Sequence, residues 1–421
     1  MRDRILAGID LGSSSIRLAV GQVVVGQDKQ ETINLIGAVE VPSAGISKGS
    51  IMSLDDATAS ISACLERVER QIGVPINDAY IGIGGVHVHA KTVKGVVGVS
   101  RPDSEIREED RMRVIDTAAA NSNSANFEIL HRIAQRFTVD DQIGIRNPVG
   151  MQGVRLEAEV CLIQGLSSHV KSLTQAVMRT SVDVSGLVFS PLATSAAIIT
   201  DRQRELGVVL VNIGASTTSV AVFEDGELLH AAVIPIGADY ITRDIAIGLR
   251  TSLEVAEAAK RTYVSAVPEA VNQYDMVNLY DLGASEAELV SPRFMSEIAQ
   301  ARVEELFEKV ELELRKIERS GLLPAGAVLT GGGSKLRGMV EMARTTLRLP
   351  ASLSPTPLIA SPLGEILHDP AFSTAIGLLM HGFEDENDHV NSGRSGGLQA
   401  GDRWLKKAAN PLKKIFKSFI P

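Results

Sequence analysis

Residues 207–223 read Gly-Val-Val-Leu-Val-Asn-Ile-Gly-Ala-Ser-Thr-Thr-Ser-Val-Ala-Val-Phe and decide the fold. The stretch begins with a continuous apolar strand that ends at Ile213, passes through a turn of small residues and ends in a second apolar strand, Ser219–Phe223. Asp225-Gly226 then predicts a hairpin turn into a third strand, Leu228–Ile236. Glycine and small hydroxyl residues let backbone N–H groups approach phosphate oxygens closely, so we expect the first turn to bind phosphate.

The N-terminus has the same pattern. A predicted strand, Ile5–Asp10, is followed by the turn Asp10-Leu11-Gly12-Ser13-Ser14-Ser15 and a second strand, Ile16–Val25. At the end of its strand, Asp10 could hold a hydrated Mg²⁺ against bound phosphates. An ordinary hairpin turn is the alternative for a single loop of this kind. The repeat of strand, glycine turn and strand in both halves predicts two related lobes.

A third glycine loop, Thr330-Gly331-Gly332-Gly333-Ser334, follows the predicted strand Ala327–Thr330. It precedes a predicted helix, Leu336–Leu347. A glycine run permits backbone contact with a flat ring or an α-phosphate, and a helix N-terminus adds positive potential. Three such loops, each after an apolar strand, favour a nucleotide site over coincidence.

Helical periodicity predicts further helices, and alternation predicts further strands. Asp55–Gln71 is a predicted helix with Asp55 as its N-cap, and Ser296–Arg319 is a long helix with an apolar stripe. Strands are expected over Ala79–Gly85 and Val86–Val99. Glu105–Ala120 is a polar helix whose mixed charges predict a solvated face.

Composition narrows the class of protein. The 421 residues include 44% hydrophobic and 22% charged side chains, the balance of a well-cored globular protein. The cysteines, Cys64 and Cys161, support neither a disulfide framework nor a cysteine metal site. No signal peptide or membrane-spanning apolar run is evident, so we expect a cytoplasmic protein. A net charge of −9 argues against general nucleic-acid binding.

The C-terminal segment differs from the acidic body. Residues 401–421 carry a charge of +5, against −14 for the rest. Apolar residues recur there at helical spacing with lysines between them, which is typical of a helix lying in a membrane surface. A helix docked on protein is the alternative. The residues expected to contact anionic lipid are Trp404, Leu405, Lys406, Lys407, Leu412, Lys413, Lys414, Ile415, Phe416, Lys417 and Phe419. Residues 384–401 are polar and non-periodic, which predicts a flexible linker.

Both hairpin loops resemble the phosphate-1 and phosphate-2 motifs of the actin, Hsp70 and sugar-kinase superfamily, and Leu329–Ser334 resembles its adenosine motif. Ser190–Ala196 and Ser373–Leu378 resemble the two connecting helices on which the lobes hinge, and their small residues would let these helices cross closely. The resemblance implies a two-lobe α/β fold that binds ATP and Mg²⁺ between its lobes. The residues it implies at the nucleotide are Asp10 (on Mg²⁺ through water), Gly12, Ser13, Ser14, Asn212, Gly214, Ala215, Ser216, Thr217, Gly237, Gly331, Gly332, Gly333 and Ser334. Glu257 and Lys260, at i and i+3 on a predicted helix, match its ribose and purine positions; a solvated ion pair is the open alternative.

Within this superfamily the chain resembles FtsA. Gly45-Ile46-Ser47-Lys48-Gly49, residues 144–150 and residues 154–160 carry the likeness, as does an extra α/β stretch where FtsA has an inserted subdomain. The implied first lobe is 1–85, 164–206 and 366–383, with 86–163 as the inserted subdomain. The implied second lobe is 207–236 and 325–365 with its subdomain 237–324, followed by the linker 384–401 and the amphipathic helix 402–421. An FtsA-type protein would form filaments, tether the C-terminal peptide of FtsZ to the membrane at the division site and recruit later division proteins.

One position departs from the superfamily. Asn212 stands where an aspartate usually heads phosphate-2, so a second carboxylate near Mg²⁺ is missing and we expect slow turnover of ATP at most. His87 and His89 alternate on one predicted strand without a carboxylate or cysteine nearby, which disfavours a metal site. Two other functions remain open, a pilus-assembly actin homologue that binds a membrane partner's peptide and a sugar or acetate kinase.

Overall fold

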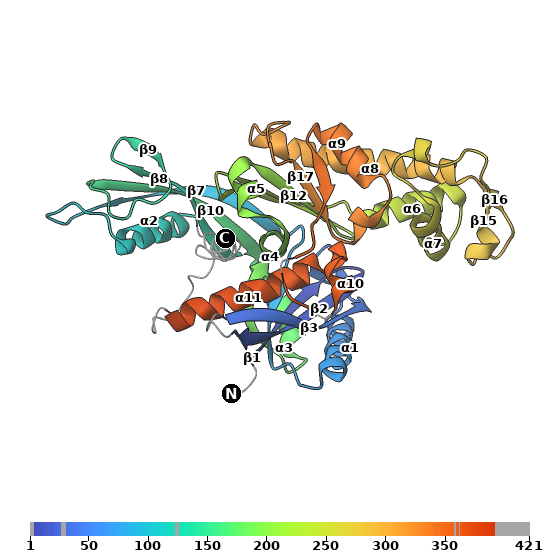
Figure 1. Ribbon diagram of the computed structural model, residues 1–421, viewed down its shortest axis with the longest axis horizontal. Helices are drawn as coiled ribbons and strands as arrows, with labels where there is room; N and C mark the ends of the chain where they lie inside the picture. Colours follow the sequence, from blue (N-terminus) through green and yellow to red (C-terminus); the bar gives the residue numbers. More distant parts are fainter. Residues whose placement is uncertain (1–3, 27–30, 123–125, 358, 362, 392–421) are drawn as a thin grey trace, which may run out of the picture.

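The computed structural model describes residues 4–26, 31–122, 126–357, 359–361 and 363–391. Two five-stranded sheets form the two lobes, and each combines a three-stranded antiparallel meander with two parallel strands. The first sheet has the order β11-β6-β1-β2-β3, from β1 (Arg4–Leu11), β2 (Ser15–Val25), β3 (Glu31–Pro42), β6 (Asp78–Ile83) and β11 (Asp183–Phe189). The second has the order β14-β13-β12-β17-β18, from β12 (Val208–Ile213), β13 (Thr218–Glu224), β14 (Glu227–Ile234), β17 (Ala327–Thr330) and β18 (Ala351–Leu353). The shared topology confirms the predicted repeat and the actin-like class (Figure 1).

Helices of the first lobe cover its sheet and lead to the second lobe. They are α1 (Leu54–Ile72), α3 (Ser167–Met178), α4 (Ser190–Ile198), α10 (Gly364–Leu367) and α11 (Ser373–Asn391). A further helix, α5 (Asp201–Leu206), packs on β13 of the second lobe. The predicted N-cap of α1 was wrong: Ser53 caps the helix by accepting from the backbone N–H of Asp56, and Asp55 lies in the first turn. A serine hydroxyl in an extended residue reaches that N–H, whereas Asp55 is already helical.

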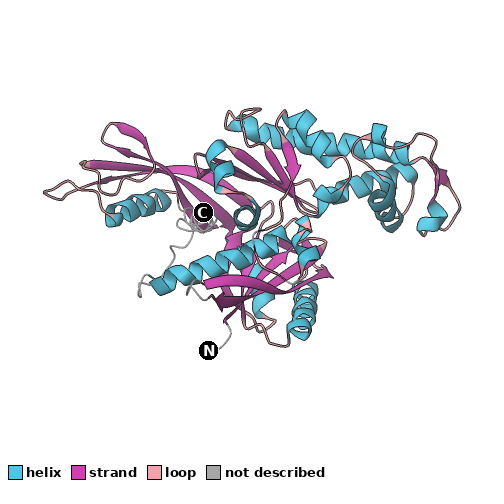
Figure 2. Cartoon of the chain, viewed as in Figure 1, coloured by secondary structure: helices cyan, strands magenta, loops and turns pink. Residues whose placement is uncertain are grey.

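The inserted subdomain extends to the left in Figures 1 and 2, and its strands contact β11 of the first lobe and β14 of the second. Its sheet has the order β7-β10-β8-β9 and packs on one helix. Its elements are β7 (Val88–Gly98), β8 (Phe127–Val139), β9 (Gln142–Ile145), β10 (Arg155–Leu166) and α2 (Glu108–Ala120). A core of its own includes Val114, Phe137 and Leu156, so the subdomain is stabilised by internal burial.

The sequence predicted that the mixed-charge face of α2 is solvated. That prediction was wrong in part, because Asp110 and Arg111 are buried. Asp110 is buried, accepts from the backbone N–H of Arg107 and pairs with Arg101 and Arg113. A buried carboxylate is tolerated because these donors satisfy it. Asp110 therefore anchors the start of α2 to the preceding turn.

The second lobe carries a helical subdomain beside its sheet, on the right of Figure 1. The helices of the second lobe are α6 (Ala238–Leu249), α7 (Leu253–Tyr263), α8 (Pro292–Lys316) and α9 (Met339–Leu347). The short strands β15 (Val277–Asn278) and β16 (Leu289–Val290) pair with each other, and in the first lobe β4 (Ile46–Ser47) pairs with β5 (Ser50–Ile51). The 3₁₀ turns of the chain are η1 (Pro268–Ala270), η2 (Leu279–Leu282), η3 (Gly332–Lys335) and η4 (Pro370–Phe372). The predicted stripe of α8 is buried in this lobe's core through Val303, Leu306 and Val310.

The C-terminal helix α11 extends further than its sequence predicted. It continues to Asn391, so the prediction of a linker was wrong for residues 384–391. Part of the reason is an acidic anchor: Tyr80 donates to Asp385 at 2.9 Å, and Arg4 pairs with Glu386 at 2.9 Å. The predicted lipid-contacting residues and the rest of the linker lie outside the described residues. In the part of the chain that the structure describes, no helix is both long and apolar enough to cross a membrane.

Candidate functional site

The first glycine loop joins β1 to β2. Asp10 lies opposite Arg17 in the antiparallel pair. Burial raises the pKa of Asp10 to about 6, and the charge of Arg17 partly offsets that rise. A Cβ added at Gly12 would lie 2.6 Å from the carbonyl oxygen of Ser15, so the turn requires glycine there. The loop thus combines a tight small-residue turn with one carboxylate at its strand end.

The second glycine loop joins β12 to β13 and supports the start of α6. The N–H of Gly214 donates to the carbonyl of Thr217 at 2.9 Å, which closes the turn. The N–H of Ala238, the first residue of α6, donates to the carbonyl of Gly214 at 2.9 Å. A Cβ at Gly237 would lie 2.4 Å from the carbonyl oxygen of Ala215, so glycine permits this close contact. Gly237, which the resemblance to the superfamily implied at the nucleotide, therefore lies against the second glycine loop.

The third glycine loop lies directly on the second. Gly331 has φ of 82°, and a Cβ there would lie 2.4 Å from Oδ1 of Asn212. A Cβ at Gly333 would lie 2.5 Å from Cγ2 of Ile213. The predicted helix start was wrong: α9 begins at Met339, and the 3₁₀ turn η3 follows the glycines instead. The positive end of α9 is therefore separated from this loop.

The two connecting helices, α4 and α11, cross beside these loops. A Cβ at Gly377 would lie 2.0 Å from the carbonyl oxygen of Ala193, so the backbones approach as closely as the small residues predicted. The third loop is tied to the start of α11, because Thr330 Oγ1 lies 3.0 Å from Ser373 Oγ. Near the start of α4, a Cβ at Gly82 would lie 3.1 Å from Oγ of Ser190 and 3.5 Å from Oδ1 of Asp10. All three loops therefore converge on the helix crossing.

Asn212 is held by a directed chain of hydrogen bonds at this crossing. Thr194 Oγ1 donates its only proton to the carbonyl of Ser190 at 2.7 Å. Thr374 Oγ1, 2.9 Å away, must therefore donate to Thr194 Oγ1. Asn212 Nδ2 in turn donates to Thr374 Oγ1 at 3.2 Å. The second loop is thus fastened to both connecting helices through a donor that an aspartate would lack.

Glu257 and Lys260 lie together on α7. Their charged atoms are 2.6 Å apart, and Lys260 also donates to Thr242 Oγ1 at 2.7 Å and to the carbonyl of Ala238 at 3.3 Å. Burial opposes ionisation of Glu257, but hydrogen bonds from Lys260 and Thr242 outweigh it and lower the pKa of Glu257 to about 2. The pair therefore links α7 to the start of α6, and its contact with ribose or purine stays a prediction.

Sequence reasoning missed four residues at this site. Arg17 reaches from the first lobe to the third loop, because its Nη2 lies 3.9 Å from a Cβ placed at Gly332. Lys48, on the β4–β5 hairpin, donates its backbone N–H to Ser216 Oγ at 3.3 Å. The other two are Thr194 and Thr374. The only sequence signal for the threonines was their place among the small residues of the connecting helices.

The alternating histidines do not form a metal site. His87 precedes β7 and stacks on His169 with ring centres 4.7 Å apart, whereas His89 meets the ring of Phe127. Burial, together with the charge of His169, lowers the pKa of His87 to about 4. Among the described residues, no group of three or more potential ligands could hold a metal ion.

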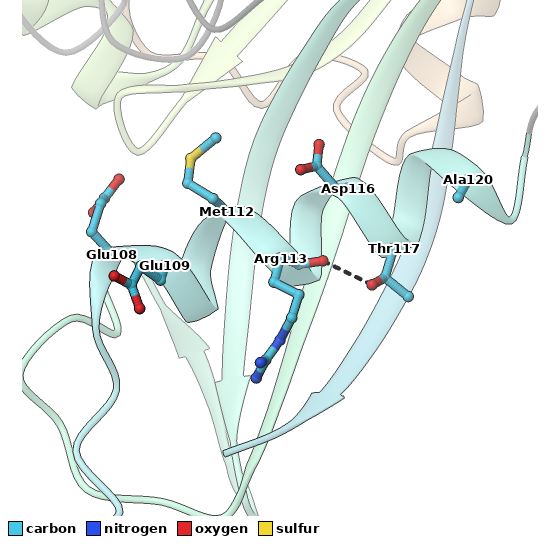
Figure 3. Close-up of a pocket in the computed structure, with 7 residues that line it drawn as sticks. All are labelled: Glu108, Glu109, Met112, Arg113, Asp116, Thr117 and Ala120. Atoms are coloured by element: carbon cyan, nitrogen blue, oxygen red, sulfur yellow. Dashed lines mark hydrogen bonds between the residues drawn. The ribbon is translucent and has the colours of Figure 1, made fainter. Parts of the chain in front are cut away.

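A concave surface also lies along α2, away from the glycine loops. Figure 3 shows the side chains that line it, with Thr117 donating to the carbonyl of Arg113 at 2.8 Å. They are Glu108, Glu109, Met112, Arg113, Asp116, Thr117 and Ala120. This surface belongs to the inserted subdomain and shares no residue with the converging loops.

Comparison with known proteins agrees with this architecture. Residues 209–377 match the family model "Cell division protein FtsA", and residues 85–164 match the model "SHS2 domain inserted in FTSA". The chain is 33% identical to the cell division protein FtsA of Pseudomonas aeruginosa over 98% of this chain and 97% of that one. The chain belongs to the FtsA family. The resemblance to FtsA and the presence of an inserted subdomain are thereby confirmed.

Solved structures show the same fold for this FtsA-family chain. A PilM–PilN type IV pilus biogenesis complex matches with a TM-score of 0.63 at 18% identity, over 90% of this chain and 98% of that one. MreB5 of Spiroplasma citri bound to ADP matches with a TM-score of 0.53 at 11% identity, over 93% and 99%. At these identities the likeness concerns the fold alone, and it confirms the actin-like class.

Proposed function

We propose that the chain is an ATP-binding, actin-like cell-division protein. It would polymerise on the inner face of the cell membrane, tether FtsZ filaments there through their C-terminal peptide and recruit later division proteins. Family membership supports the role in cell division. The observation that carries the nucleotide part is the convergence of three glycine loops on the crossing of α4 and α11, since a ligand held there would touch both lobes.

The residues at the loops fit a nucleotide. A side chain at Gly12, Gly331 or Gly333 would clash with neighbouring atoms of the loops themselves, so these glycines let the loops pack tightly and present backbone where a phosphate would bind. The solved likeness to an MreB5 bound to ADP is consistent with this use of the fold. When bound, ATP would place its negatively charged phosphates between the glycine loops of the two lobes.

Few side chains at these loops could hold Mg²⁺. Asp10 is the carboxylate at the phosphate-1 turn, and Asn212 offers an amide whose N–H groups face the connecting helices. One carboxylate fits a metal held mainly by phosphates and water. The residues therefore support binding with slow turnover, and Asp10 would position the metal through water.

The experiment that tests the proposal is co-sedimentation of the full chain and a 1–400 truncation with anionic liposomes, with and without Mg-ATP. The truncation keeps every residue of the described fold and removes the lysine-rich segment. We expect only the full chain to pellet with liposomes, and more of it with Mg-ATP. Equal pelleting of both chains, or of neither, would refute membrane attachment through residues 402–421.

A parallel titration with a fluorescent ATP analogue tests the nucleotide site directly. We expect both chains to bind it, because the truncation leaves the three loops intact. Absence of binding would refute the nucleotide part of the proposal even if the liposome result stood. The kinase alternative predicts phosphoryl transfer to a small acceptor, and the pilus alternative predicts a peptide partner in place of lipid.

A further inference from the structure

The β4–β5 hairpin of the first lobe ends in the two-residue turn Lys48-Gly49. Both residues have positive φ, 50° and 79°, as the tight hairpin turns with matching twist require. Asparagine or aspartate is the usual first residue of such a turn, and a lysine is strained in this conformation. A strained backbone conformation of this kind persists only where the surrounding structure fixes it, and such residues are common at functional sites.

Neighbouring backbone holds Lys48 in place. A Cβ at Gly49 would lie 2.0 Å from the carbonyl oxygen of Gly84, and one at Gly85 would lie 2.4 Å from the carbonyl oxygen of Lys48. The N–H of Val86 donates to that same carbonyl at 3.3 Å. The turn is therefore clamped against the segment after β6 and cannot shift easily.

The tip of this turn reaches the opposite lobe. The backbone N–H of Lys48 donates to Oγ of Ser216 at 3.3 Å, and Ser216 belongs to the second glycine loop. The contact joins the first lobe to the loop proposed to hold the terminal phosphates. Because the lysine stem has four flexible carbons, its ammonium can extend from this contact toward a phosphate bound at the loop.

The ammonium of Lys48 is available for such a contact. The side chain is partly buried and, among the described residues, makes no ion pair. Its Nζ lies 5.7 Å from the ring centre of Tyr240 on α6. By contrast, Lys260 and Lys335 near the same loops are paired with Glu257 and Asp369.

The electrostatic surroundings favour an anion at this point. Arg243 also lies over the Tyr240 ring, with 5.3 Å between Cζ and the ring centre, and it has no ion pair among the described residues. A phosphate oxygen attracts an ammonium more strongly than an aromatic face does, because the hydrogen bond is charge-assisted. Two cations over the Tyr240 ring would therefore attract a terminal phosphate.

We propose that Lys48 contacts the terminal phosphate of a bound nucleoside triphosphate from the opposite lobe and sets the preference for triphosphate over diphosphate. The inference rests on the proposed nucleotide site. Lys48 is a specificity residue here: its ammonium adds to the binding free energy only when the third phosphate is present. Binding of the adenosine and the first two phosphates depends on the glycine loops.

The test compares Lys48→Met and Lys48→Arg in the full chain, with Lys171→Met as the matched control. Methionine keeps most of the stem and removes the charge, arginine restores a charge, and Lys171 is exposed on α3 of the same lobe. Affinities for Mg-AMPPNP and Mg-ADP are measured by isothermal titration calorimetry. Thermal unfolding of each variant verifies the fold.

We expect Lys48→Met to weaken Mg-AMPPNP binding by about tenfold or more, as for the loss of a charged hydrogen bond, and Mg-ADP binding by less than about threefold. Lys48→Arg should recover most of the preference, and Lys171→Met should match the unaltered chain. Equal weakening of both nucleotides, or no change in either, overturns the role of Lys48. If the unaltered chain binds neither nucleotide, the proposed nucleotide site itself fails.

Discussion

Replacing Asn212 by aspartate tests the directed hydrogen-bond chain at the hinge. An ionised carboxylate accepts hydrogen bonds only, so it cannot replace the N–H that Asn212 donates to Thr374. Thr374 would turn its proton toward the new carboxylate, while Thr194 still donates to the carbonyl of Ser190. The two threonine oxygens, 2.9 Å apart, would then face each other without a proton between them.

The cost follows from the number of hydrogen bonds lost. The threonine hydroxyls lie in buried residues, and one hydrogen bond between α4 and α11 is removed. A lost bond that leaves a buried polar atom unsatisfied costs about 1–3 kcal/mol. We expect Asn212→Asp to lower the free energy of unfolding by about 2 kcal/mol.

The pH dependence separates this account from a general effect of the substitution. A protonated carboxyl can donate to Thr374, so the native state favours the neutral form and raises the pKa of the new aspartate above its ordinary value of about 3.9. The destabilisation is therefore absent when the group is protonated in both states, and it grows as the pH rises through the raised folded-state pKa. Chemical denaturation of the unaltered chain and the variant at several pH values from 4 to 8 measures the difference.

The matched control is Asn147→Asp. Asn147 is exposed, and its side-chain oxygen accepts from the N–H of Val149 at 3.2 Å, a contact that aspartate keeps. We expect this variant to stay within about 0.5 kcal/mol of the unaltered chain. If Asn212→Asp is as stable as Asn147→Asp at pH 7.5, or if its deficit does not shrink at low pH, the directed chain is wrong.

Two further predictions concern the same hinge and its metal. Gly377→Ala should lower the free energy of unfolding by about 1–3 kcal/mol, because the new Cβ would lie 2.0 Å from the carbonyl oxygen of Ala193. The control is Gly364→Ala, because a Cβ at Gly364 has open space around it. Equal denaturation curves for the two variants would contradict the close crossing of α4 and α11. The affinity for Mg-ATP should fall as the pH drops below about 6, since Asp10 has a pKa raised to about 6 and only its ionised form attracts the hydrated metal. Asp10→Asn should bind weakly and lose this dependence, and an identical pH profile in that variant would rule out Asp10.

Much of the fold could be predicted because its signals are local. The apolar strands on either side of the two hairpin loops and the stripe of α8 reappear within a few residues of their predicted bounds. Errors arose where a distant partner decides the local structure. The helix α11 continues into polar residues because Tyr80 and Arg4, from the other end of the chain, hold its side chains.

The site was less predictable for the same reason. Glycines in a loop indicate close backbone approach, but they do not reveal which loops meet. Lys48 belongs to a segment that carries the likeness to FtsA, but nothing in the sequence assigned it to the site, and only the tertiary contact with Ser216 sets it beside the second loop. Thr194 and Thr374 are ordinary helix residues until α4 and α11 cross.

The departure at Asn212 gains a structural reason from that crossing. A carboxylate at this position would add a second negative charge beside a bound metal, as hydrolysis favours. It would also remove the donor to Thr374, so that no proton would lie between the hydroxyl oxygens of Thr374 and Thr194. The amide satisfies them and fixes the second loop to both connecting helices. A hinge held in this way would transmit which nucleotide is bound without requiring rapid hydrolysis, because the lobes would be coupled through the loop proposed to contact the phosphates. The proposed slow turnover and a firmly coupled hinge would then be two consequences of one side chain.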